Sequence, residues 1–153
     1  MSPEEALGGQ GKTLPPPNPA VANYVMGVRT GSLLFVAGHG AFEDGQPVCR
    51  GKLGADLSTD EGRSAAETVM LNLLATVKAE LGELSSVARV LKVVVFVNST
   101  PDFTDQHLVA DGATDLLVHA FGDVGRPARS AIGVAALPLN FAVEIEAIVQ
   151  TRD

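Results

Sequence analysis

A single long amphipathic segment limits the architectures open to this chain of 153 residues. Ser58 and Glu61 have the spacing of a capping box, which predicts a helix start at that point. Apolar residues then recur at helical spacing until Gly82, a residue typical of helix ends, so we expect a helix over 59–81. Its apolar stripe consists of Val69, Leu73, Val77 and Leu81. A stripe on one side of a helix requires a sheet or another helix to cover it.

Segments rich in β-branched and aromatic residues predict the strands that cover this stripe. A turn at Thr30-Gly31 separates the first two of them. A second helix is expected over 104–121, with Asp111-Gly112 weakening its middle. The expected strands are Tyr24–Val28, Leu33–Ala37, Val48–Leu53, Val90–Val97, Ala128–Leu137 and Phe141–Val149. This order of elements predicts an α+β fold with both helices on one face of a sheet.

Length and composition indicate one globular domain. Hydrophobic residues make up 46% of the chain and charged residues 19%, which excludes a disordered composition. Residues 1–20 are rich in Gly and Pro, and the run from Pro15 to Pro17 favours an extended course. We therefore expect an N-terminal arm over 1–20, followed by a single domain over 21–153.

Charge and cysteine content argue against several kinds of site and partner. The formal net charge of −7 disfavours binding to nucleic acid or to an anionic membrane. Cys49 is the only cysteine, so an intramolecular disulfide is impossible and a cysteine-based metal site is not expected. Glu4 and Glu5 stand where a secretion signal has basic residues, and no apolar segment approaches membrane-spanning length. We expect a cytoplasmic protein without a membrane partner.

The C-terminal third carries the side chains most suited to chemistry. Glu144 and Glu146 share one face of a predicted strand. Arg129 shares a strand face with small residues such as Ala131, which suits close approach by a ligand or by another subunit. Two interpretations stay open at this point: an antiparallel hairpin in which Arg129 pairs with one of the glutamates, or a functional site. His39, between Gly38 and Gly40, is either a polar loop residue or part of such a site.

Several of these segments together resemble one known family. Pro127-Ala128-Arg129-Ser130, the Leu137-Pro138 turn and the strand Val143–Ile148 resemble the C-terminal signature of the RidA/YjgF family of 2-imino acid deaminases, which older usage calls endoribonuclease L-PSP. Tyr24-Val25 with Leu33–Gly38 is similar to the opening hairpin of that family. Val95-Phe96-Val97, followed by Asp102-Phe103, is similar to its central strand. The resemblance covers about residues 20–150.

The resemblance implies a fold, an assembly and a reaction. The fold is a chorismate-mutase-like α+β domain with a mixed sheet, assembled as a homotrimer with ligand pockets between subunits. Arg129 corresponds to the arginine that holds the substrate carboxylate, Glu144 to the glutamate that positions or activates water, and Tyr24 to the tyrosine that closes the pocket. The implied reaction is the hydrolysis of 2-imino acids to 2-keto acids and ammonia, with no metal or organic cofactor.

Three positions depart from the pattern of that family. Ala37, Ala131 and Gly112 stand where family deaminases commonly have serine, cysteine and asparagine. With Gly38 and His39, these positions complete the expected substrate-binding set, and His39 is a candidate replacement for a missing polar group. The departures favour a divergent subfamily. The alternative functions are a non-catalytic trimer that binds small carboxylates or keto acids and, ranked last, an RNA-cleaving or translation-inhibiting protein.

Overall fold

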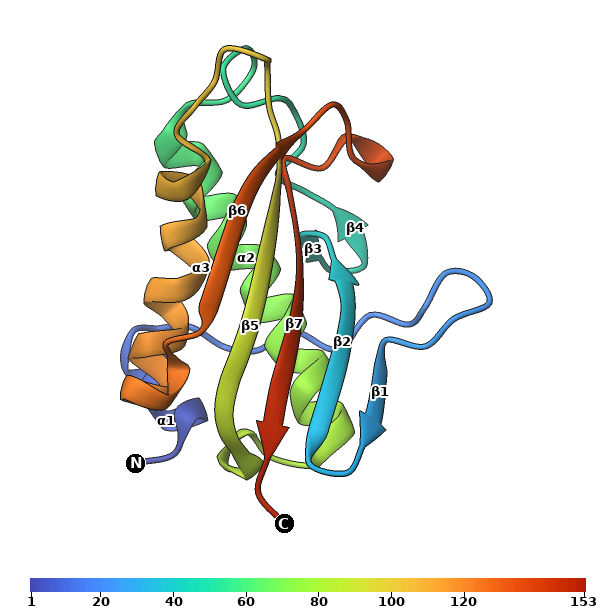
Figure 1. The fold of residues 1–153 in the computed structure, drawn as a ribbon, viewed down its shortest axis with the longest axis vertical. Helices are drawn as coiled ribbons and strands as arrows, with labels where there is room; N and C mark the ends of the chain where they lie inside the picture. The colour runs from blue at the N-terminus through green and yellow to red at the C-terminus, as the bar shows by residue number, and fades with distance from the viewer.

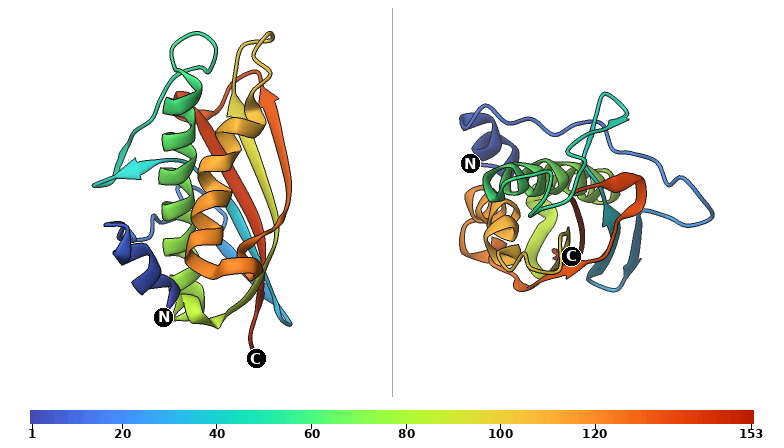
Figure 2. Two further views of the ribbon diagram at one scale, coloured as in Figure 1. Left: turned by 90° about the vertical axis from the view of Figure 1, so that its left-hand side faces the viewer. Right: turned by 90° about the horizontal axis from the view of Figure 1, so that it is seen from above.

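The computed structural model describes residues 1–153. A five-stranded sheet forms one layer, and two helices cover one face of this sheet (Figures 1 and 2). The strand order is β1-β2-β7-β5-β6. β5 and β6 are parallel and the other pairs are antiparallel, so the sheet is mixed. The strands are β1 (Gly27–Thr30), β2 (Leu33–His39), β5 (Val87–Asn98), β6 (Ala128–Val134) and β7 (Val143–Thr151). The predicted α+β class is confirmed.

Helix α2 (Thr59–Leu81) has the predicted bounds, because its local signals act as the sequence indicates. The Ser58 hydroxyl accepts a hydrogen bond from the Glu61 backbone N–H, and the Glu61 carboxylate accepts one from the Ser58 N–H. Gly82 ends the helix with a φ of 89°. Most of the apolar stripe is buried in the core between the helices and the sheet.

Helix α3 (Gln106–Phe121) begins two residues later than predicted and continues through Asp111-Gly112 without a break. The reason lies in the packing of α3 against α2. A β-carbon at position 112 would collide with the backbone carbonyl of Arg63, so the glycine permits close contact between the two helices. Tertiary packing therefore offsets the weak helix propensity of glycine at this position.

The region after β2 differs from the prediction. Val48–Leu53 forms only isolated bridges, and the small hairpin of β3 (Phe42–Glu43) and β4 (Gln46–Pro47) precedes it. Cys49 and Gly51 have φ values of 55° and 130°, which interrupt an extended backbone there. The opening hairpin is present. Its first strand begins at Gly27, three residues later than expected, and the turn of the hairpin is at residues 31–32.

The last two strands are not partners. β6 pairs with β5 alone, whereas β7 lies between β5 and β2. The connection between them, which contains the short 3₁₀ turn η3 (Pro138–Asn140), therefore passes from one side of β5 to the other (Figure 1). The hairpin interpretation of the C-terminal segment was wrong because β5 lies between β6 and β7 in the sheet.

The N-terminal segment is more structured than its composition indicates. Helix α1 (Pro3–Gly9) has a capping box formed by Ser2 and Glu5, and its Leu7 is buried in the core. The His119 ring on α3 hydrogen-bonds the Ala6 carbonyl over 2.7 Å and the Gln10 side chain over 3.0 Å. These contacts hold the start of the chain against α3. Two further 3₁₀ turns are η1 (Leu84–Ser86) and η2 (Gly122–Gly125).

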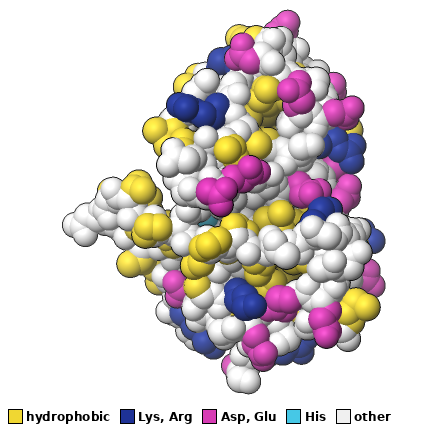
Figure 3. All heavy atoms as spheres, turned by 180° about the vertical axis from the view of Figure 1, so that it is seen from behind, with side chains coloured by type: hydrophobic (Ala, Val, Ile, Leu, Met, Phe, Trp, Pro, Cys, Tyr) yellow, Lys and Arg dark blue, Asp and Glu magenta, His cyan; other side chains and the backbone are white.

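Charged side chains on the helix-covered side do not form a single patch. Acidic side chains are spread over that side, and basic side chains lie singly among them (Figure 3). No helix is both long enough and apolar enough to cross a lipid bilayer.

Candidate functional site

A cavity of about 430 Å³ brings together four of the predicted site residues: Tyr24, Gly38, His39 and Glu144. It lies where the end of β2 and the start of β7 meet the segment before β1 and the loop around η3. Its other lining residues include Val21, Met26, Phe42, Leu139 and Phe141. The cavity therefore combines apolar walls with one acidic group, a common composition for a small-molecule site.

Glu144 is the acidic group of this cavity. Burial, and secondly the charge of Glu146, raise the pKa of the Glu144 carboxyl above its ordinary value. The carboxylate forms no hydrogen bond or ion pair within the chain. A β-bulge in β2 places Gly38 against it, since Val36 pairs with Ala147 and His39 pairs with Ile145. A β-carbon at position 38 would lie 3.1 Å from the Glu144 carboxyl carbon, so the glycine makes room for the acid.

His39 has its ring buried, with only 3% of the residue exposed. Its Nδ1 lies 2.6 Å from the Ala37 carbonyl oxygen, and its Nε2 lies 2.7 Å from the Thr76 hydroxyl. Because a carbonyl only accepts, Nδ1 carries the proton and Nε2 accepts from Thr76. Burial lowers the pKa of His39, so the ring is neutral. Both ring nitrogens are thus engaged within the chain, so we do not expect His39 to replace a missing pocket group. The polar loop interpretation was wrong, because His39 is the buried last residue of β2.

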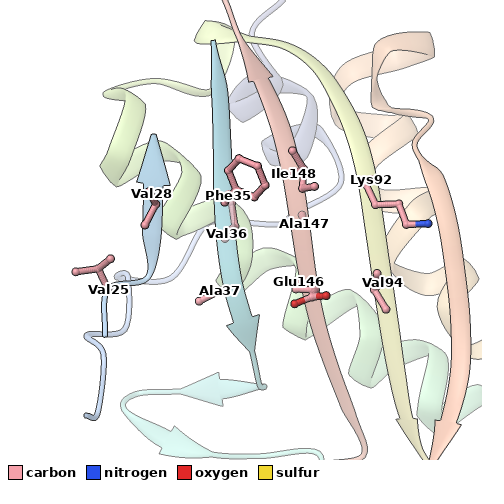
Figure 4. Close-up of a pocket in the computed structure, with 10 residues that line it drawn as sticks. All are labelled: Val25, Val28, Phe35, Val36, Ala37, Lys92, Val94, Glu146, Ala147 and Ile148. Atoms are coloured by element: carbon pink, nitrogen blue, oxygen red, sulfur yellow. The ribbon is translucent and has the colours of Figure 1, made fainter. Parts of the chain in front are cut away.

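Ala37 lies in a neighbouring groove on the uncovered face of the sheet. This groove has a volume of about 300 Å³ and is lined mainly by apolar side chains of β1, β2, β5 and β7. Phe35 and Ile148 lie side by side in it, Lys92 lies next to Ile148 on β5, and Glu146 lies further along β7 (Figure 4). The groove is a continuation of an open, largely apolar sheet face.

Arg129 lies at the other edge of the sheet, on β6, and points toward α3. Its Nη1 donates to Asp111 over 2.8 Å and to the Thr114 hydroxyl over 3.1 Å, and its Nη2 donates to the His107 carbonyl over 3.3 Å. A guanidinium has five N–H donors, so the Nε–H and one Nη2–H remain without a partner. Asp111 is therefore the partner of Arg129, in place of the glutamate that the hairpin interpretation expected.

Arg129 and Glu144 project from opposite faces of the sheet. Val93 lies beside Arg129 in the β5–β6 ladder and is fully buried under the helices. Phe96 lies beside Glu144 in the β5–β7 ladder and, three residues further along β5, projects from the other face. Within one chain the two residues do not meet.

Comparison with known proteins places this chain in a family. A family model described as "Endoribonuclease L-PSP" matches residues 16–151. The chain belongs to this family. The predicted RidA/YjgF membership is thereby confirmed. The structure of protein Atu1372 from Agrobacterium tumefaciens is 43% identical, with a TM-score of 0.93 over 98% of this chain and 92% of that one.

Two relatives illustrate the similarity of this chain to named proteins. Protein TCP17 of Trypanosoma cruzi is 45% identical over 144 residues, which cover 94% of this chain and 90% of that protein. The 2-iminobutanoate/2-iminopropanoate deaminase of Dermatophagoides farinae is 34% identical over 104 residues, which cover 65% of this chain and 73% of that enzyme. The name of the Dermatophagoides relative is that of an imine deaminase, whereas the name TCP17 states no activity.

Two expected site positions on the Arg129 side have different surroundings. Ala131 lies two residues beyond Arg129 on the same face of β6. Gly112 instead packs against α2, while its neighbour Asp111 reaches Arg129. Sequence reasoning missed Asp111, which is 18 residues from Arg129 and on another element. The available signal was the helical spacing of Asp111 and Thr114, which puts both side chains on one side of α3.

Proposed function

We propose that this L-PSP family protein hydrolyses reactive imine or enamine intermediates derived from amino acids, giving 2-keto acids and ammonia. The observation that carries the proposal is the unpaired Glu144 carboxylate, half-buried beside Tyr24 in a cavity of substrate size. The name of the Dermatophagoides relative supports the same reaction class. The proposed ligand is a small carboxylate that carries a C=N bond.

The proposed chemistry needs one group that both takes and returns a proton. Water adds through its oxygen to the imine carbon while the Glu144 carboxylate removes a proton from that water. The protonated Glu144 returns this proton to the imine nitrogen, which gives a neutral carbinolamine. Glu144 then takes the proton of the carbinolamine hydroxyl and passes it to the amino nitrogen, the C–N bond breaks as the C=O bond forms, and ammonia and a 2-keto acid leave. A carboxyl group with a raised pKa suits this exchange better than an ordinary glutamate, because it is more basic. An imine carbon is already electrophilic, so the proposal includes no metal or organic cofactor.

Arg129 is proposed as the group that holds the substrate carboxylate. Asp111, Thr114 and the His107 carbonyl fix the guanidinium on one side. The two N–H groups left over, on Nε and Nη2, are the donors with which arginine makes bidentate contact to a carboxylate. Positioning of this kind supplies a large part of the rate enhancement in a reaction between bound substrate and water.

The site is proposed to form between subunits of a homotrimer. Since Arg129 and Glu144 project from opposite faces of one sheet, a pocket that uses both requires residues from two copies. The uncovered sheet face is suited to assembly, because Val28, Phe35 and Ile132 are 53%, 43% and 45% exposed on it. β6 also has a free edge, which natural proteins commonly cover.

A second candidate function, binding of a keto acid without catalysis, is supported by the ion pair between Arg129 and Asp111. Asp111 neutralises part of the charge of Arg129, and Ala37 and Ala131 supply no polar side chain. A protein with these features could bind a keto acid without hydrolysing an imine. The two functions differ in whether ammonia is released.

The test generates 2-imino acids from several amino acids with an amino-acid oxidase, in the presence of semicarbazide as a competing trap. The wild-type protein is expected to lower the rate of semicarbazone formation, and Arg129→Ala and Glu144→Gln are expected to lose this effect. Keto-acid binding without any diversion of imine by the wild type would replace the enzyme with the binding function. If Glu144→Gln diverted imine from semicarbazide as well as the wild type does, the proposed proton transfer by Glu144 would be contradicted.

A further inference from the structure

A second cavity, of about 460 Å³, lies at the carboxyl ends of β5 and β6, away from the Glu144 cavity. In Figure 1 this is the upper end of the molecule, where the loops before α2 and α3 meet the end of β6. Its lining consists of Lys52, Ser99, Thr100, Pro101, Phe103, Gln106 and residues 133–135. Lys52 is the only charged residue in that lining.

The Lys52 ammonium has neutral partners only. Its Nζ donates to the Asn98 side-chain oxygen over 2.7 Å and to the Ala135 carbonyl over 2.6 Å. No carboxylate lies within ion-pair distance of Nζ, whereas the ammonium groups of Lys12 and Lys78 each have a glutamate partner. An ammonium has three N–H donors, so one remains for a ligand. A half-buried cation without a counter-ion favours an anionic ligand, the more so in a chain of net charge −7.

The position of Lys52 is fixed by a buried neighbour. The Asn98 side chain is 1% exposed, and its amide donates to the backbone carbonyls of Gly51 and Phe141 and to the side-chain oxygen of Asn140. These bonds orient the Asn98 oxygen toward Lys52. The ammonium is therefore held in place before any ligand arrives, which lowers the entropic cost of binding.

The rest of the lining has both polar and apolar character. The Ser99 hydroxyl donates to the Val97 carbonyl over 3.2 Å. The Gln106 amide donates to the Phe103 carbonyl over 2.7 Å and to the Ser99 oxygen over 3.4 Å, so the donors of both side chains are engaged within the chain and Lys52 is the one left for an anion. A β-carbon at position 133 would lie 2.7 Å from the Ser99 hydroxyl and 2.8 Å from the Gln106 amide, so glycine keeps these groups close to β6. Pro101, Phe103 and Val134 supply apolar surface. The cavity therefore suits a ligand with one anionic end and a short apolar part.

We propose that this cavity is a second binding site, which takes a small organic carboxylate through a charge-assisted hydrogen bond to the Lys52 ammonium. The site stands apart from the proposed deaminase function, since none of its lining residues belongs to the Glu144 cavity or contacts the Arg129 guanidinium through a side chain. A carboxylate is preferred over inorganic phosphate because a single ammonium matches a single negative charge and the apolar walls match a hydrocarbon substituent.

The test follows the backbone amide signals of the ¹⁵N-labelled full-length protein during titration with 2-oxobutanoate, acetate and inorganic phosphate. 2-Oxobutanoate is expected to shift the signals of Ser99, Gln106 and Gly133 in a saturable way. Lys52→Met is expected to weaken this binding at least tenfold, and Lys52→Arg to retain most of it. Lys12→Met is the matched control, since it removes the same charge from a lysine that already has a glutamate partner.

Each outcome has a defined meaning. Saturable shifts at these three amides establish the site if they survive in Arg129→Ala and need at least tenfold more ligand in Lys52→Met, whether or not the protein hydrolyses imines. Tighter binding of phosphate than of 2-oxobutanoate would overturn the carboxylate class. An absence of shifts at these amides in the wild type would overturn the site itself, and that result does not depend on whether Lys52→Met folds. Failure of the deaminase proposal would appear separately, as unaltered semicarbazone formation.

Discussion

The Arg129 guanidinium donates a 2.8 Å hydrogen bond to the Asp111 carboxylate, and this ion pair joins strand β6 to helix α3. The two side chains are 24% and 36% exposed, so water screens the pair only partly. Asp111 thereby fixes the orientation of the guanidinium and also lowers its attraction for a second carboxylate. The residue proposed to bind substrate is both positioned and partly neutralised by the same neighbour.

Replacing Asp111 should therefore strengthen the binding of keto acids. Asp111→Asn keeps a hydrogen-bond acceptor for Arg129 and removes the competing charge. We expect the dissociation constant for 2-oxobutanoate at the Arg129 site to fall about three- to tenfold, which corresponds to roughly 0.6–1.4 kcal/mol. Titration calorimetry in the Lys52→Met background measures this. Asp115→Asn is the control, since its carboxylate is 73% exposed and pairs with Arg63. Unchanged affinity in Asp111→Asn would show that Arg129 does not bind the ligand.

Glu144 should make stability depend on pH in a defined direction. Its pKa is raised in the folded chain, so the proton is bound more tightly there than in the unfolded chain. The favourable contribution is complete below the ordinary glutamate pKa and is lost as pH rises through the raised value. Glu144→Gln is thus expected to raise the melting temperature at neutral pH and to lose this advantage in acid. Equal melting temperatures at neutral pH would contradict the burial of this charge.

The same residue should set the acid limb of catalysis. If the Glu144 carboxylate removes a proton from water, imine diversion falls as pH drops through its raised pKa, at a higher pH than an ordinary glutamate would give. A pH profile of the semicarbazide assay measures this limb. If activity fell only near the ordinary glutamate pKa, the Glu144 carboxyl with its raised pKa would not be the group that takes the proton from water.

His39 is expected to matter for folding and not for turnover. His39→Ala removes the partner of the Thr76 hydroxyl, which is 2% exposed, and leaves a cavity beneath β2. We expect a loss of about 2–4 kcal/mol in the free energy of unfolding, measured by urea denaturation. Imine diversion per folded molecule should stay within about twofold of the wild type. A stable but inactive His39→Ala protein would show that His39 takes part in the reaction.

Gly112 should tolerate no side chain. The added β-carbon of Gly112→Ala meets the Arg63 carbonyl, a backbone atom that moves only if α2 and α3 separate. We expect a net loss of about 1–3 kcal/mol, although alanine has the better helix propensity. Gly8→Ala in α1 is the matched control, because a β-carbon there meets no atom within 4 Å. Equal stability of the two variants would refute the close packing of the helices.

The open sheet face gives a prediction about assembly. Phe35→Asp places a charge in the apolar groove of Figure 4, where a partner subunit is proposed to pack. Sedimentation is expected to show a trimer for the wild type and a smaller species for Phe35→Asp. Glu43→Asp, on the exposed β3 strand outside that groove, should assemble normally. A monomeric wild type would rule out the shared site.

Local signals in the sequence determined the long helix and most of the strands. Ser58, Glu61 and Gly82 act within a single helical turn of their own position, so the bounds of α2 were predictable. The extended segments that form β5, β6 and β7 were also predictable, because β-branched residues favour an extended backbone wherever the strands pair. Arg129 and Glu144 also stood out by their strand faces, and the family signature added Tyr24 and connected the three residues.

Tertiary structure alone decided which of these elements and side chains meet. The parallel pairing of β5 with β6 separated Arg129 from Glu144 and removed the hairpin that proximity in sequence had favoured. The contact of Gly112 with Arg63 kept α3 continuous, and the α3–β6 packing brought Asp111 to Arg129. These contacts join residues far apart in the chain, and their energies depend on distances that exist only once the sheet and helices have packed.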